Sequence, residues 1–192
     1  MGLVDRAQSL SLQVNRQGLN AEALEISGRA SSLNGDFDRA LKLFKEAARL
    51  DPDLESNKNA IRQCRTVRQV LVDARKASFD REFGKAVELY EVAKNSYSTI
   101  PPRSPLNAIL FSESAGARLR LKDFEGCLQD CAVCLYGKDD CVEAWLYKSS
   151  ALHGLGRPRD ALAELEPLMQ KWGQVSAAAG AKKTARTCRL CV

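Results

Sequence analysis

Apolar and small side chains recur at spacings of three and four residues along most of this chain, which is the pattern of amphipathic helices. In the first clear example, Leu24, Gly28 and Ser31 fall on one helical face. A second amphipathic stretch follows a turn at residues 34–36 and ends at Pro52, which cannot continue a helix. Neither stretch can bury its apolar stripe alone, so the pattern predicts an antiparallel pair of helices.

The same pair recurs three more times in the chain. The second helix of each copy carries an anchoring small residue, and these anchors lie 46, 41 and 34 residues apart: Ala40, Ala86, Cys127 and Ala161. Extra residues near 54–67 and 97–104 account for the two longer spacings. A position on the first helix must also be small, because the two helices cross most closely there; Gly28 satisfies this in the first copy. Helix pairs in series bury their stripes only against one another, so the sequence predicts an all-α solenoid.

These blocks resemble the tetratricopeptide repeat (TPR), a helix pair of about 34 residues. In the first copy, nine residues fall on the signature positions: Leu24, Ser27, Gly28, Ser31, Phe37, Ala40, Phe44, Ala47 and Pro52. The resemblance implies a right-handed TPR solenoid whose first helices line a concave groove. Repeats are expected at 21–54, 55–100 (with an extended helix), 101–141 and 142–175. Residues 1–20 fit, less closely, the second helix of an incomplete N-terminal repeat, and 176–192 are expected to form a flexible basic tail.

The order of the blocks resembles the second TPR set of TPR-containing DnaJ co-chaperones. The segments that carry this resemblance include NGDFDRALKLFKEAARLDP, REFGKAVELYEVA and LKDFEGCLQDC. In that family a J domain with a His-Pro-Asp triplet follows the last repeat. Here the only histidine, His153, is followed by Gly154 and Leu155. The resemblance therefore implies a co-chaperone-like chain that lacks the J domain.

The resemblance also implies a binding site on the first helices. TPR co-chaperones often hold the acidic tail of a heat-shock chaperone in a carboxylate clamp, which requires cationic or amide donors. Of the residues at the five clamp positions, only Arg75 can pair with a carboxylate, and two are glutamates. A clamp of the usual kind is therefore not expected. A peptide or helix is expected to bind instead across Arg68, Leu71, Arg75, Glu113, Glu143 and Tyr147.

The expected function is that of a non-catalytic, protein-binding adaptor associated with chaperones. Its partner is a protein or peptide, and heat-shock chaperones are the first candidates. The alternative is a general TPR scaffold of another complex, which the altered clamp favours. The sequence contains no phosphate-binding glycine loop and no arrangement of catalytic residues, so neither enzyme activity nor a cofactor is expected. It also contains no signal-peptide core and no membrane-spanning apolar run, which predicts a cytoplasmic protein.

Seven cysteines raise a rival interpretation. Two CxxC pairs, Cys131 with Cys134 and Cys188 with Cys191, could together supply four thiolates to zinc or respond to oxidants. However, Cys127, Cys131 and Cys134 occupy repeat positions that pack between helices, where cysteine behaves as a small hydrophobic residue. Core packing is therefore the preferred interpretation and no metal is expected, with a zinc- or redox-responsive module as the lesser alternative.

A ridge of basic residues recurs every three or four positions on one predicted helix: Lys58, Arg62, Arg65 and Arg68. Such a ridge can bind phosphates or an acidic partner. It is more often a solvated face, and no aromatic residues are interleaved with it to stack on bases. The net charge of +5 is modest, so nucleic-acid binding is not expected.

Overall fold

The computed structural model describes residues 20–96 and 100–172, and within them the secondary structure is entirely helical. The helices are α2 (Ala21–Leu33), α3 (Phe37–Leu50), α4 (Glu55–Phe79), α5 (Phe83–Asn95), α6 (Pro105–Arg120), α7 (Phe124–Gly137), α8 (Val142–Gly154) and α9 (Pro158–Trp172). The helix expected within residues 1–20 and the tail expected at 176–192 lie outside the described residues. None of the described helices combines the length and apolarity needed to cross a membrane.

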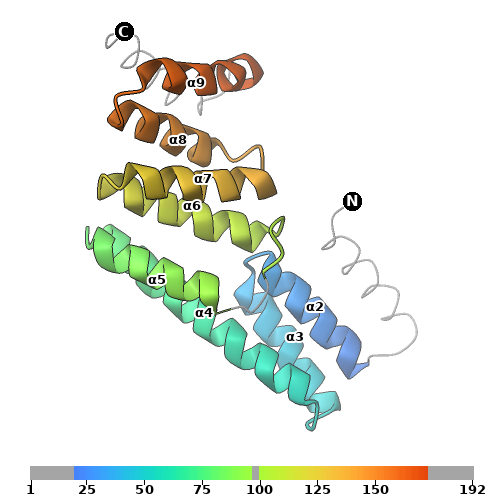
Figure 1. Cartoon of the computed structure of the whole chain (residues 1–192). Helices are drawn as coiled ribbons and strands as arrows, with labels where there is room; N and C mark the ends of the chain where they lie inside the picture. The colour runs from blue at the N-terminus through green and yellow to red at the C-terminus, as the bar shows by residue number, and fades with distance from the viewer. Residues whose placement is uncertain (1–19, 97–99, 173–192) are drawn as a thin grey trace.

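The helices form four antiparallel pairs that stack in chain order (Figure 1). Within a pair, α2 packs on α3, α4 on α5, α6 on α7 and α8 on α9. Between pairs, α3 packs on α4, α5 on α6 and α7 on α8. Each helix pair therefore covers the apolar face of the next, and the predicted all-α solenoid is confirmed.

The predicted close crossing occurs within each pair. In the first pair, Gly28 of α2 lies against the ring of Phe44 on α3, and a β-carbon at Gly28 would stand only 2.5 Å from a ring carbon. Ala74, Ala115 and Ser149 occupy the corresponding places in the later pairs, and all three are fully buried. The small residues on the first helices thus allow the second helices to approach, as the repeat pattern requires.

Each hairpin turns through one residue with a left-handed backbone. These residues are Gly35, Arg81, Lys122 and Gly156, with φ angles of 84°, 63°, 63° and 73°. In every case the next residue donates its N–H to the carbonyl five positions earlier, which is the hydrogen bond of a Schellman motif. Two turns carry a side chain where glycine would be unstrained, so the repeated hydrogen bond holds Arg81 and Lys122 in this conformation.

Helix α4 is long enough to pack against two pairs. Near its start, Asn57 is buried and donates its side-chain amide to the carbonyl of Phe44 on α3, at 2.9 Å. Farther along, Leu71 and Ala74 pack in one cluster with Tyr90 of α5. The extra residues between the first two repeats therefore extend α4, which contacts both the first pair and α5.

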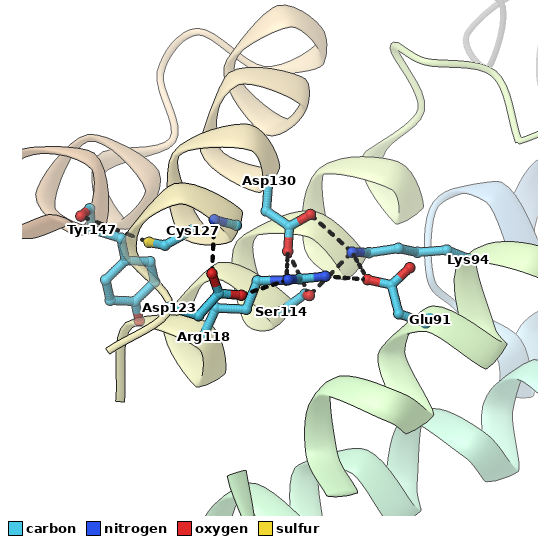
Figure 2. A network of polar contacts seen from close by, with 9 residues as sticks. Glu91, Lys94, Ser114, Arg118, Asp123, Cys127, Asp130 and Tyr147 are labelled. Atoms are coloured by element: carbon cyan, nitrogen blue, oxygen red, sulfur yellow. Dashed lines mark hydrogen bonds and ion pairs between the residues drawn. The ribbon is translucent and has the colours of Figure 1, made fainter. Parts of the chain in front are cut away.

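A network of buried charges joins the second and third pairs (Figure 2). Lys94 of α5 lies 2.9 Å from Asp130 of α7 and 3.0 Å from the hydroxyl of Ser114 on α6. Asp130 also accepts hydrogen bonds from Ser114 at 2.6 Å and from Arg118 of α6 at 3.0 Å. The side chains of Lys94 and Asp130 are only 9% and 7% exposed, so their charges are compensated by one another rather than by water.

Two less buried carboxylates complete this network. Arg118 lies 2.9 Å from Glu91 of α5 and 2.7 Å from Asp123, which also caps α7 by accepting from the Gly126 amide. The hydrogen bond from Arg118 holds the pKa of Asp123 below its usual value. Burial raises the pKa of Glu91, but hydrogen bonds from Lys94 and Arg118 lower it more, so both carboxylates favour the ionised form. The network thus fixes the orientation of α5 relative to α6 and α7.

We predict that alanine at Gly28 and alanine at Gly84 will have opposite effects on stability. At Gly28 the new β-carbon meets the Phe44 ring, and overpacking of this kind costs about 1–3 kcal/mol. At Gly84, in the first turn of α5, nothing lies within 4 Å, so alanine should stabilise the helix by about 0.5–1 kcal/mol. Urea unfolding of both variants checks this, and two shifts of the same sign would contradict the crossing geometry.

We also predict that Asp123→Asn will make the stability less dependent on acid. A carboxyl whose pKa is lowered by folding contributes stability above its unfolded pKa, and this is lost as the pH falls through the folded pKa. The wild-type free energy of unfolding should therefore decrease from about pH 5 to about pH 3. Asparagine can still cap α7 but does not titrate, so the decrease should be shallower in the variant. Equal slopes in urea unfolding across this range would show that Asp123 carries no such contribution.

Candidate functional site

The main hollow on the first helices lies between α4, α6 and α8 and has a volume of about 460 Å³. Its charged and aromatic lining includes Arg75, Phe79, Arg81, Glu113, Arg120 and Tyr147. A second hollow of about 290 Å³ adjoins it, between the α2–α3 turn, α4 and α6, and Arg75 lines both. The two hollows, which meet at Arg75, are together called the groove. A larger hollow of about 740 Å³ lies between α5, α6 and α7, beside the buried charges of Lys94 and Asp130.

The central contact of the groove joins two residues that the sequence placed there. Arg75 of α4 forms a two-pronged ion pair with Glu113 of α6, with N–O distances of 2.7–3.1 Å. The hydroxyl of Tyr90 also donates to Glu113, at 3.2 Å. The hydrogen bond from Glu113 raises the pKa of Arg75. Burial, followed by the charge of Glu113, raises the pKa of Tyr90 to about 12. Arg75, the only arginine at a clamp position, is therefore already paired with a carboxylate of its own chain.

The structure places the other predicted groove residues in different surroundings. Arg68 is partly exposed and pairs with Asp38 of α3 at 2.8 Å. Leu71 borders the second hollow but is only 2% exposed, because it packs in the core between α4 and α5, so it offers little surface to a partner. Tyr147 lies over Gly116, where a β-carbon would come within 3.2 Å of its ring. Glu143 is exposed and is not among the residues that line the two hollows.

Three groove residues were missed by the sequence reasoning. Phe79 ends α4 and its side chain is 87% exposed, which is unusual for an aromatic residue. Arg81 lies in the α4–α5 turn and Arg120 ends α6, and neither forms an ion pair with any described residue. All three lie at or just after the end of a helix, whereas the TPR repeat pattern assigns groove positions to the interior of the first helices. The sequence feature that could have identified them is an arginine at or just after the end of two first helices.

The structure also bears on the rival interpretations of the sequence. Cys131 and Cys134 are fully buried in α7, and their thiols contact the protein interior. Among the described residues, no three His, Cys, Asp or Glu side chains are arranged to hold a metal ion; the pair Cys188 and Cys191 lies outside them.

The basic ridge on α4 is partly neutralised. Lys58 pairs with Glu55 and Arg68 with Asp38, while Arg62 and Arg65 are exposed. The ridge is therefore a mixed surface in which two of the four cations have acidic neighbours. It differs in this from the main hollow, which is lined by an exposed aromatic residue and by two arginines that have no ion partner within the part of the chain that the structure describes.

No family model matches the chain. Among curated proteins, human DnaJ homolog subfamily C member 7 is 23% identical over 171 residues, which cover 88% of this chain and 34% of the relative. Its Schizosaccharomyces pombe homolog is 28% identical over 132 residues, covering 66% of this chain and 26% of that protein. The chain thus spans about a third of the length of the curated relatives it matches.

Several solved structures that resemble it are TPR domains. The P58(IPK) TPR domain has a TM-score of 0.76 at 13% identity, over 98% of this chain and 50% of that one. The second TPR domain of human RPAP3, solved with an HSP70 peptide, gives 0.56 at 15% identity, over 66% and 98%. The TPR2AB domain of yeast Sti1, in an HSP90 complex, gives 0.56 at 14% identity, over 97% and 78%. The chain therefore has the fold of a right-handed TPR solenoid, and its sequence is similar to part of the DnaJ homolog subfamily C member 7 proteins.

Proposed function

We propose that this chain is a non-catalytic adaptor that binds a peptide or helix of a chaperone-associated partner in the groove along α4, α6 and α8. The adaptor role is supported by the fold, since stacked helix pairs leave an extended inner surface for a partner. Heat-shock chaperones are the first candidate partners, because RPAP3 and Sti1 were solved with HSP70 and HSP90 ligands. The proposed location is the cytoplasm.

The observation that carries this proposal is the composition of the main hollow. Arg81 and Arg120 line it without ion partners among the described residues, and the exposed side chain of Phe79 lines it as well. The charge of Arg75 is offset by that of Glu113, so the hollow keeps a positive excess beside an apolar surface. Such a surface complements a segment that combines an acidic residue with a bulky apolar one.

This arrangement differs from a carboxylate clamp in where the acidic group would bind. In the proposed complex the ligand carboxylate pairs with Arg81 or Arg120 at the ends of helices, and Arg75 with Glu113 forms the floor of the hollow. Leu71 is omitted from the proposed contact surface because it is buried. Tyr147 borders the same hollow and adds aromatic surface on the α8 side.

A scaffold role in a different assembly is the second candidate. It is favoured by the ion pair between Arg75 and Glu113, because an arginine that already holds a carboxylate is less available to a chaperone tail. On this alternative the same hollow binds an acidic segment of a protein that is not a heat-shock chaperone.

The test is to measure binding of the peptide SGPTIEEVD, the HSP70 sequence bound by RPAP3, by fluorescence anisotropy. We expect binding, weakened roughly tenfold or more in Arg120→Glu, since one charge-assisted hydrogen bond contributes about 1.5–3 kcal/mol. Arg65→Glu is the matched control: it makes the same charge change on an exposed face of α4 outside the groove, and it should bind like the wild type.

The two candidates give different results. If the peptide does not bind but an affinity pull-down with the intact chain retains partners that Arg120→Glu loses and Arg65→Glu keeps, the scaffold role is supported. If Arg120→Glu and Arg81→Glu lose neither the peptide nor any pulled-down partner, the groove is not the binding site.

A further inference from the structure

Two cysteine thiols meet on the same turn of helix α6. The thiol of Cys134, on α7, donates to the carbonyl of Ala108 at 3.4 Å, and the sulfur of Cys141 lies 3.8 Å from the hydroxyl of Ser112. In an α-helix the amide of residue 112 donates to the carbonyl of residue 108, so these two residues are neighbours on adjacent turns. Cys134 and Cys141 accordingly pack in one cluster with Ala108.

The chain between these cysteines folds back on itself to bring them together. The Lys138 amide donates to the Cys134 carbonyl at 2.8 Å, and the Cys141 amide donates to the Lys138 carbonyl at 3.3 Å. Cys141 then occupies the position immediately before α8, where the helix presents its free backbone amides. Because the two residues belong to different elements, α7 and the start of α8, their sulfurs are not held apart by the geometry of a single helix.

The two sulfurs differ in access. Cys134 is completely buried, whereas Cys141 keeps 8% of its surface exposed and has the Glu143 carboxylate 3.7 Å away. Both residues are buried, and of the two only Cys141 keeps any exposed surface. The less buried thiol is therefore assigned as the reactive cysteine and the fully buried one as its resolving partner.

We infer that Cys134 and Cys141 form a redox site, which hydroperoxides convert from two thiols into a disulfide.

The chemistry proceeds in two balanced steps. The Cys141 thiolate attacks one oxygen of hydrogen peroxide, the O–O bond breaks, and Cys141 becomes a sulfenic acid while hydroxide leaves and is protonated to water. Cys134 then attacks the sulfenic sulfur, its thiol proton leaves with the hydroxyl as a second water, and the S–S bond forms. The peroxide oxygens are reduced and the two sulfurs are oxidised by one electron each.

The electrostatics favour this division of roles. The interaction with Cys134, together with the Ala144 amide and Ser112, lowers the pKa of Cys141, whereas burial and the charge of Glu143 act to raise it. The same interaction, together with burial, raises the pKa of Cys134. Cys141 is thus the thiol of the pair that ionises more readily.

The other described cysteines lack this arrangement. Cys127 and Cys131 share α7 at a spacing of four residues, as do Cys131 and Cys134 at a spacing of three. Such neighbours on a helix have β-carbons about 5–6 Å apart. A disulfide requires about 3.5–4.5 Å, so these pairs cannot close without distorting the helix. Cys127, Cys131 and Cys64 are also completely buried.

The experiment uses the full chain, reduced, freed of reductant and treated with one equivalent of hydrogen peroxide. Trypsin cleaves after Lys122, Lys138 and Lys148, so a Cys134–Cys141 disulfide links peptides 123–138 and 139–148, which mass spectrometry detects. We expect this linked pair as the main oxidation product. Dimedone, which captures sulfenic acids, should label Cys141 in Cys134→Ala, where the resolving thiol is missing.

The variants should retain the fold. Alanine occupies the place of Cys134 in two other repeats, at Ala47 and Ala93, and serine at Cys141 is a favourable helix cap. Cys127→Ala is the matched control, because Ala40 and Ala86 stand at its position, and it should form the linked peptides at the wild-type level. Circular dichroism confirms folding of each variant.

Three outcomes would overturn the inference: no linked peptides, linked peptides that persist in Cys141→Ser, or linked peptides that persist in Cys134→Ala. Peptide binding to the groove is measured separately and without oxidant. A failure of the redox site and a failure of the proposed adaptor function are therefore distinguishable.

Discussion

Each helix pair in this protein depends on one close crossing, where a small residue on the first helix lies against the second. At Gly28 the approach leaves no room for a β-carbon beside Phe44, and at Ala74, Ala115 and Ser149 the small side chain is sealed from water. A larger residue at any of these places would separate the helices and expose the apolar stripe of both. Because a pair formed in this way covers only one of its apolar faces, the next pair must cover the other, and the chain becomes a solenoid.

Polar interactions then decide how successive pairs are oriented. Between the second and third pairs, the buried Lys94 and Asp130 satisfy each other's charge, and Arg118 extends the network to Asp123 and Glu91. Such a network is sensitive to geometry, because a buried charge without its partner is costly. It therefore restricts the angle between α5 and α6, and with it the separation of α4 and α6 on which the main hollow depends.

The repeat architecture also explains why cysteine thiols are found at core positions. Cysteine and alanine are interchangeable at the small positions of the second helices, as Cys127 and Cys134 on α7 show beside Ala40 and Ala47 on α3. At most of these sites the thiol is simply a small apolar group. Where the chain leaves α7 and returns before α8, a sulfur from outside that helix, that of Cys141, packs in one cluster with Cys134.

The sequence by itself determined the helices, their pairing and the small positions at which they cross, because these features recur at fixed local spacings that sterics impose on every copy. It also placed Arg75, Glu113 and Tyr147 on the same side of the first helices, where they line one hollow. Only the tertiary structure decided that Arg75 is paired with Glu113, that Leu71 is buried, that Arg81 and Arg120 share a hollow, and that Cys134 meets Cys141. Each of these features depends on how one helix is rotated and displaced relative to another. That arrangement is set by many weak contacts of long side chains and turns, and no local sequence pattern predicts it.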